Sequence, residues 1–268
     1  MILTVNHITH YRYDQPVRGV VQSHRLYPSC FDGQRVIVWD VTLSDGIAGG
    51  GFRDAAGDWI QGYSVQGPVD ALSVTVTGQV ETRDLAGVLS GHRESIPPEA
   101  YLVETPATRA DRTLIELGRA AKGSTPDLLE QAHRLSGAIS DAIVYRPGVT
   151  AAHTTAAEAL ALGEGVCQDH AHALIASARS ADIPARYVSG YLLVGQDRGE
   201  AAHAWAELWV AGLGWVGFDP ANRCCPDARY IRLGSGMDAR DAAPIRGIAR
   251  GMGAETMDVS VAIQSVQQ

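Results

Sequence analysis

Near residue 90 the hydrophobic pattern changes from the period of a strand to that of a helix, and this change restricts the fold more than any other feature of the sequence. Before it, apolar side chains stand at every second position in residues 35–43 and again in residues 72–80. A period of two is typical of a strand with one buried face. Residues 52–59 lie between these segments and have Gly57 where a hairpin turn needs it. Several short strands separated by turns predict an antiparallel, sandwich-like β domain.

Beyond the change, the apolar residues follow a helical period. Residues 128–143 carry a single apolar stripe, and Thr125–Pro126 offers an N-cap followed by proline at the first helical position. A second helix is predicted from Thr155, because Glu158 completes a capping box, and it should end at Gly163. Helices therefore open the second half of the chain.

A third helix and then three strands follow. The helix is predicted to begin at Cys167 and to stop near Asp182, since Pro184 prevents its continuation. The strands are short segments that are rich in aromatic and β-branched residues, at 186–194, 203–210 and 214–219. The second half is therefore predicted to be α+β, with an antiparallel sheet after the helices.

The stretch between the two patterns, residues 87–106, consists largely of Gly, Ser, Pro and charged residues, which is typical of a domain linker. We therefore predict an N-terminal β domain at residues 1–88, a linker at residues 89–108 and an α+β domain at residues 109–268. A chain of 268 residues is long enough for two domains of modest size.

The charge of the chain argues against a nucleic-acid partner. The net charge is −8, whereas a phosphate backbone must be met by a basic face. The first residues form neither a basic leader nor a continuous apolar segment, so we expect no secretion signal, no contact with a membrane and a cytoplasmic protein. Four cysteines are too few for a disulfide scaffold, so a single cysteine in such a compartment is of interest for its reactivity.

Cys167 stands where a loop with two glycines, residues 163–166, enters a predicted helix. The positive end of the helix dipole favours the thiolate, and the backbone N–H groups there can hold a developing oxyanion. The alternative interpretation is a small apolar residue at the start of a buried helix. That plainer interpretation is the one that we give to Cys30, Cys224 and Cys225.

A histidine and an aspartate follow on two neighbouring predicted strands. His203 begins one strand and Asp219 ends the next, and the two strands are joined by a tight turn at residues 212–214. In such a hairpin the two residues can be cross-strand neighbours near its open end. A carboxylate there can fix the tautomer and orientation of the imidazole. Taken singly, each residue could also be an ordinary histidine and an aspartate that ends a strand.

Four blocks occur in order in the second half: Gly165–Asp169, Pro184–Tyr191, His203–Trp205 and Gly214–Pro220. With these blocks, residues 145–222 resemble the transglutaminase-like superfamily, in particular its bacterial members with an additional N-terminal β domain. A weaker similarity in residues 24–28 and 54–59 extends into the N-terminal half.

The resemblance implies a papain-like catalytic domain in which Cys167 is the nucleophile, His203 its base and Asp219 the residue that orients the base. Such a pair attacks an amide or ester carbonyl and leaves a thioester on the cysteine. Water then gives an amidase or peptidase, whereas an amine gives a transglutaminase, and the sequence favours neither. We expect a peptide or protein substrate and no metal or other cofactor. The family's Gly-Arg-Asp element corresponds to residues 236–238, where Met237 replaces the arginine.

Two other interpretations remain open at this point. Cys167, His170 and His172 with Cys224–Cys225 could be ligands of a zinc ion, although the two histidines would point to different sides of a helix and no second pair completes four ligands. The fold could also persist as a catalytically silent module that binds a protein in its cleft. An intact cysteine, histidine and aspartate argue against the silent module.

Overall fold

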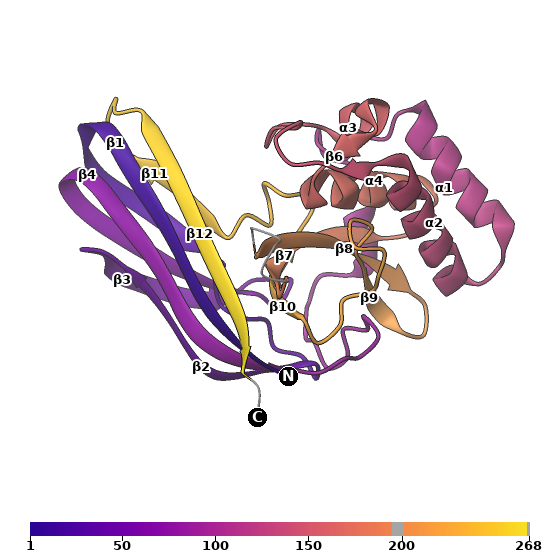
Figure 1. Cartoon of the computed structure of the whole chain (residues 1–268), viewed down its shortest axis with the longest axis horizontal. Coiled ribbons are helices and arrows are strands. Elements are labelled where there is room, and N and C mark those ends of the chain that lie inside the picture. The colour runs from indigo at the N-terminus through magenta and orange to yellow at the C-terminus, as the bar shows by residue number, and fades with distance from the viewer. Residues whose placement is uncertain (195–200, 267–268) are drawn as a thin grey trace.

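The computed structural model describes residues 1–194 and 201–266 of the chain. In this part of the chain, one sheet lies at one end of the molecule, a second sheet lies in the middle, and α-helices cover the far face of the second sheet (Figure 1). This arrangement confirms the predicted α+β class with an antiparallel β domain at the N-terminus.

The first sheet is built around two long antiparallel strands, β1 (Ile2–His24) and β4 (Trp59–Thr82). Both strands change register near residues 12–19 of β1, and each half has its own partners. On one side of the shift the partners are β12 (Glu255–Val266) and β2 (Gln34–Leu43), and on the other they are β11 (Ile245–Ala249) and β3 (Ile47–Arg53).

The two halves face each other across a shared apolar core. The hydroxyl of Tyr63, on the β3 side, donates a hydrogen bond to the carbonyl of Val41 in β2 at 3.0 Å. Residues of both halves, among them Val5 and Val65, belong to one buried cluster. The bent strands therefore give a sandwich-like domain, and the hairpin predicted around Gly57 joins β3 to β4 with a left-handed backbone angle of +83° at that glycine.

The two C-terminal strands, β11 and β12, lie in the first sheet and not in the second domain. We predicted that residues 109–268 form one domain, but β11 and β12 pair with β1 and complete the first sheet. This part of the predicted boundary is wrong. The physical reason is that β1 needs a partner on each side, and β4 supplies only one of them.

The second sheet has four antiparallel strands in the order β10-β7-β8-β9. These are β7 (Ala185–Leu192), β8 (Ala202–Val210), β9 (Gly214–Phe218) and β10 (Tyr230–Gly236). The helices are α1 (Arg112–Ser124), α2 (Leu128–Ala142), α3 (Ala156–Leu162) and α4 (Cys167–Ser180), and a short parallel pair joins β5 (Val144–Tyr145) to β6 (Glu164–Gly165). The buried helix α4 packs Leu174 and Ile175 against the sheet residues Ala206 and Leu208.

The helix starts agree with the sequence in two cases and differ in two. The capping box of Thr155 and Glu158 is present, and α4 begins at Cys167 as predicted. The predicted cap of α2 is wrong by two residues. The side chain of Asp127 accepts the hydrogen bond from the amide of Leu129, whereas the hydroxyl of Thr125 accepts from the amide of Asp127 outside the helix. The structure also adds α1, which the sequence analysis left within the second domain without a helix.

The predicted linker is packed along the second sheet. Its 3-10 helix η1 (Pro98–Leu102) buries Tyr101 edge-on against Trp215, with ring centroids 5.3 Å apart. The amide of Leu89 donates to the carbonyl of Trp215 at 2.9 Å. The carbonyl of Ser90 accepts from the amide of Asp32 in the N-terminal domain at 2.8 Å, so this stretch contacts both domains.

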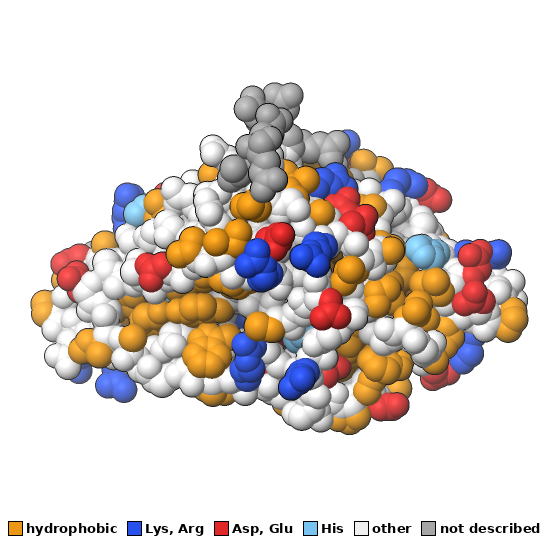
Figure 2. Space-filling model, turned by 90° about the horizontal axis from the view of Figure 1, so that it is seen from below, with side chains coloured by type: hydrophobic (Ala, Val, Ile, Leu, Met, Phe, Trp, Pro, Cys, Tyr) orange, Lys and Arg blue, Asp and Glu red, His pale blue; other side chains and the backbone are white. Residues whose placement is uncertain are grey.

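On the face seen from below, basic and acidic side chains are interspersed, and hydrophobic side chains gather over the first sheet and over the helices (Figure 2). Among the described residues, none of the helices has both the length and the apolar character that crossing a bilayer requires.

Candidate active site

Cys167 is presented at the start of α4 by a short and rigid approach. Gly163 ends α3 with a left-handed angle of 71°, and β6 leads directly to Val166 and the helix. The carboxylate of Asp169 accepts hydrogen bonds from the amide of Val166 at 2.8 Å and from the hydroxyl of Thr150 at 2.6 Å. A side chain at Gly165 would collide with that carboxylate, which explains the glycine. Asp169 therefore stabilises the start of the helix.

His203 and Asp219 lie side by side at the open end of the β8–β9 hairpin, as the sequence predicted. The Nε2 atom of His203 is 2.6 Å from the Oδ2 atom of Asp219. Because a carboxylate only accepts, Nε2 carries the proton of this bond. The side chain of Cys167 also forms a hydrogen bond with His203. The structure therefore brings the three predicted residues together.

The charges of the three groups support one another. Burial alone would lower the pKa of His203, but its hydrogen bonds to Asp219 and Cys167 and the negative charges of both groups raise it to about 10. Burial would raise the pKa of Asp219, whereas the bond from His203 and those from Asn222 and Tyr230 hold it below its usual value. These two shifts favour a protonated imidazolium on His203 beside an ionised carboxylate on Asp219 at neutral pH.

The sequence analysis missed two neighbours of Asp219. The side-chain amide of Asn222 donates to its Oδ2 atom at 2.8 Å, and the hydroxyl of Tyr230 donates to the same atom at 2.8 Å. Asn222 follows Asp219 by three residues in one turn, and that spacing was a usable signal. Tyr230 had no such signal, because its place depends on how β10 pairs with β7.

The histidines of the zinc alternative have other partners. His170 has its Nδ1 atom 2.9 Å from the carbonyl of Val166 and its Nε2 atom 2.9 Å from that of Ile143. His172 accepts a hydrogen bond from the amide of Ala239. Across residues 1–194 and 201–266, no group of three or more histidine, cysteine or acidic side chains is arranged to hold a metal ion.

The element at residues 236–238 keeps an arginine contact despite Met237. The buried guanidinium of Arg179 on α4 donates to the carbonyl of Met237 at 2.8 Å and to that of Ala185 at 2.9 Å. Asp238 and Asp241 bond backbone amides of the same loop. An arginine from α4 thus contacts the loop at Met237.

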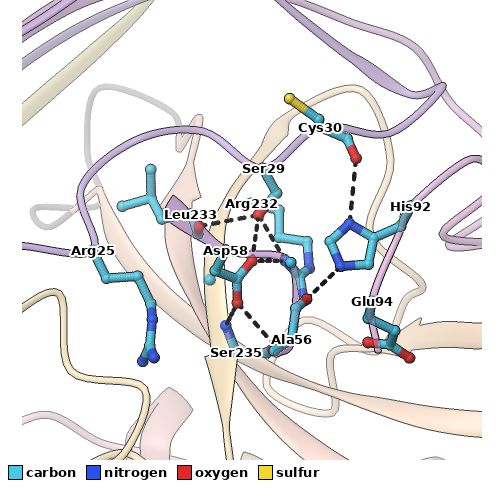
Figure 3. Close-up of polar contacts among 12 residues, drawn as sticks. Arg25, Ser29, Cys30, Ala56, Asp58, His92, Glu94, Arg232, Leu233 and Ser235 are labelled. Carbon is cyan, nitrogen blue, oxygen red and sulfur yellow. Dashed lines mark hydrogen bonds and ion pairs between the residues drawn. The ribbon is translucent and has the colours of Figure 1, made fainter. Parts of the chain in front are cut away.

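A buried network of ion pairs and hydrogen bonds connects the second sheet to the first domain. Asp58, from the β3–β4 hairpin, lies between Ser29, Arg232 and Ser235, as Figure 3 shows, and its bond to Arg232 is 2.7 Å long. Arg232 also bonds Glu207 of β8 at 2.8 Å. These side chains are at most 3% exposed. The network continues through Glu207 to Arg186, which also pairs with Glu94 of the linker.

We expect Cys167 to react with iodoacetamide at pH 7 at least about tenfold faster than the other three cysteines, because it opens a helix and faces His203. Burial raises the pKa of Cys224, and it raises that of Cys225 to about 11, so both should react slowly. Cys30 is exposed and is the sharpest comparison. Timed peptide mapping by mass spectrometry gives the four rates, and denatured protein provides the control. A Cys167 that is the slowest in the folded protein would contradict activation.

Comparisons with known proteins show similarity over both parts of the chain. The family model of the transglutaminase-like superfamily matches residues 116–220, and that of the bacterial transglutaminase-like N-terminal region matches residues 3–81. An uncharacterised protein of Mycobacterium leprae is 32% identical over 283 residues, which cover 97% of this chain and 98% of that protein.

Two further proteins are similar over the fold or over part of the chain. The crystal structure of a proposed cysteine protease from Cytophaga hutchinsonii has a TM-score of 0.75 and 21% identity, and it covers 100% of this chain and 92% of its own. A protein-glutamine gamma-glutamyltransferase of Pseudomonas aeruginosa is 28% identical over 192 residues, or 59% of this chain and 28% of that enzyme. The first similarity shows the fold, and the second is confined to a part of a longer protein.

Proposed function

Because the chain belongs to the transglutaminase-like superfamily, we propose that it is a thiol-dependent acyl-transfer enzyme that acts on amide bonds of a peptide or protein. In this proposal Cys167 is the nucleophile, His203 its base and Asp219 the residue that orients the imidazole. The observation that carries the proposal is the position of His203, which forms hydrogen bonds with both Asp219 and Cys167.

In the first step the sulfur of Cys167 attacks the carbonyl carbon of the amide while His203 holds the proton of the thiol. The oxyanion that forms needs donors at the start of α4. Cys167 is the first residue of that helix, so its backbone N–H has no acceptor within the helix and can serve. His203 then gives its proton to the departing amine, the C–N bond breaks, and a thioester remains on Cys167.

In the second step a nucleophile resolves the thioester, and His203 takes its proton. Water would release an acid, and an amine would form a new amide. The P. aeruginosa relative is named as a protein-glutamine gamma-glutamyltransferase and the C. hutchinsonii protein as a cysteine protease, so both transfer and hydrolysis belong to the proposal. The chemistry of the three residues is the same for both.

The test is to trap the acyl group. The protein is incubated with a peptide library that contains glutamine, quenched in acid, and its Cys167 peptide is examined by mass spectrometry for an added acyl mass. Hydroxylamine should convert the thioester to a hydroxamate. A second incubation with an added amine separates the two reactions, because transamidation gives a new amide of that amine whereas hydrolysis gives the free acid. EDTA or calcium should leave the yield unchanged, because the proposed steps use only side chains and backbone of this chain.

A catalytically silent binding module is the competing function. It predicts that peptides are retained by the folded protein while Cys167 acquires no acyl mass and no amine is released. Such a result, in protein whose Cys167 still alkylates rapidly, would refute acyl transfer.

A further inference from the structure

The carboxylate of Asp219 accepts hydrogen bonds from two other side chains besides His203. Its Oδ2 atom accepts from His203, from Asn222 and from Tyr230. Asn222 lies in the same turn as Asp219, so its bond is local. Tyr230 comes from β10, which is the far edge of the sheet from β9, so its bond requires the tertiary fold.

The ring of Tyr230 is held in place by packing. It is 5% exposed, and its centroid lies 5.9 Å from that of His203 and 5.4 Å from that of Trp205, edge-on to the latter. Packing on two sides fixes the ring, and its hydroxyl reaches the carboxylate at 2.8 Å. The same residue therefore touches both His203 and Asp219.

A third group lies behind the tyrosine. The Sγ atom of Cys224 is 3.3 Å from the hydroxyl oxygen of Tyr230. The phenol has a single proton, and the carboxylate can only accept, so the phenol proton goes to Asp219 and the thiol must donate to the phenol oxygen. Burial raises the pKa of Cys224, and burial and the charge of Asp219 raise that of Tyr230, so both groups keep their protons at neutral pH.

Cys224 is brought to this place by the turn that begins at Asp219. The backbone amide of Asp219 donates to the carbonyl of Cys224 at 2.8 Å, and the backbone amide of Cys224 donates to the carbonyl of Asp219 at 3.2 Å. The neighbouring Cys225 packs instead against the core of the helices and strands. Only one of the two adjacent thiols can therefore act on the tyrosine.

We propose that Tyr230 is a positioning residue for the His203–Asp219 pair, and that the thiol of Cys224 strengthens its hydrogen bond to the carboxylate. The proposal rests on the proposed function for its importance to turnover, but the hydrogen-bond chain can be tested without a substrate. Donors in series polarise one another, so loss of the thiol weakens the next bond.

The test is the titration of His203 in Tyr230→Phe, which keeps the ring and removes only the hydroxyl. The hydroxyl shares the Oδ2 atom with His203, so its removal concentrates the carboxylate charge on the imidazolium. The titration midpoint of His203 should rise by about half a pH unit above that of the unchanged protein. Two-dimensional NMR of protein with labelled histidine measures it, and the signal that disappears in His203→Gln assigns it.

Matched variants serve as controls. Tyr191→Phe removes another buried hydroxyl of the same sheet, one that bonds His7 of the first domain, and it should leave the midpoint unchanged. Cys224→Ala should raise the midpoint by a smaller amount in the same direction, whereas Cys225→Ala should not move it. An identical midpoint in folded Tyr230→Phe and in the unchanged protein would overturn the proposal. If Tyr230→Phe does not fold, Cys224→Ala decides in the same way.

The rate at which Cys167 takes up an acyl group gives the second measurement. Tyr230→Phe should lower this rate about tenfold, which corresponds to the loss of one hydrogen bond. If His203 shifts as expected while no peptide acylates Cys167, the positioning is right and the proposed function is wrong. If acylation occurs at the same rate in both proteins and His203 does not shift, the function stands and the positioning is wrong.

Discussion

Cys167→Ala is expected to abolish acyl transfer, with a loss of at least about a thousandfold, and to leave the fold intact. The reason is that no thioester can form without the sulfur, while the half-buried side chain contributes little to the core. Turnover and circular dichroism on the same sample check both halves of the statement. Cys225→Ala is the control, because this thiol lies outside the site and should leave turnover unchanged. Full activity in Cys167→Ala would remove the basis of the mechanism.

Asp219→Asn should cost less, about tenfold to a hundredfold, because an amide oxygen can still accept from His203, as in Cys-His-Asn enzymes. The structure shows why the loss is not zero. The Oδ1 atom of Asp219 accepts a hydrogen bond from the backbone N–H of Asn222 at 3.3 Å. In Asp219→Asn the side-chain NH₂ group would take the place of Oδ1, so two donors would face each other and this hydrogen bond would be lost. The same turnover assay ranks the two variants, and a larger loss in Asp219→Asn than in Cys167→Ala would contradict the assigned roles.

Asp58→Asn is expected to destabilise the protein by about 3 kcal/mol or more, because it leaves the buried guanidinium of Arg232 with one fewer negative partner. Urea unfolding at pH 7 measures the change. Glu81→Gln is the matched control. Its partner Arg35 is 69% exposed, so the loss of this ion pair should destabilise the protein far less than Asp58→Asn does. Equal effects of the two substitutions would show that burial does not set the strength of this network.

The same network predicts a dependence on acid. Burial would raise the pKa of Glu207, but the charges of Arg232 and Arg186 lower it to about 2 from its usual 4.5. A lowered pKa in the folded state gives a stability that is complete above about pH 4.5 and is lost as the pH falls toward 2. Asp58, whose pKa is also held down by Arg232, acts in the same direction. Unfolding of Asp58→Asn should therefore depend less steeply on pH across this range.

The sequence predicted those parts of the fold and the site that depend on local signals. The capping box at Thr155, the helix start at Cys167 and the turn between β8 and β9 are set by residues within a few positions of one another. His203 and Asp219 could be paired in advance because one short turn fixes the register of their hairpin.

The parts that the sequence did not predict depend on contacts between distant segments. Tyr230 reaches Asp219 only because β10 pairs with β7, and Asp58 meets Arg232 across 174 positions of the chain. The sequence of β12 does not indicate which sheet the strand joins. It belongs to the first sheet because it pairs with the edge of β1 that β4 leaves free. Periodicity shows which face of a strand is buried but not which strand will be its neighbour.

The pairing of β1 with β12 also bears on the order in which the molecule can be made. During synthesis β1 can find β4 early, but its other edge stays open until residues 245–266 have left the ribosome. Through most of translation the nascent chain therefore exposes a long unpaired edge, which is the kind of surface that recruits chaperones or adheres to another chain. The second domain is synthesised in that interval, so its helices and sheet can assemble before the first domain closes.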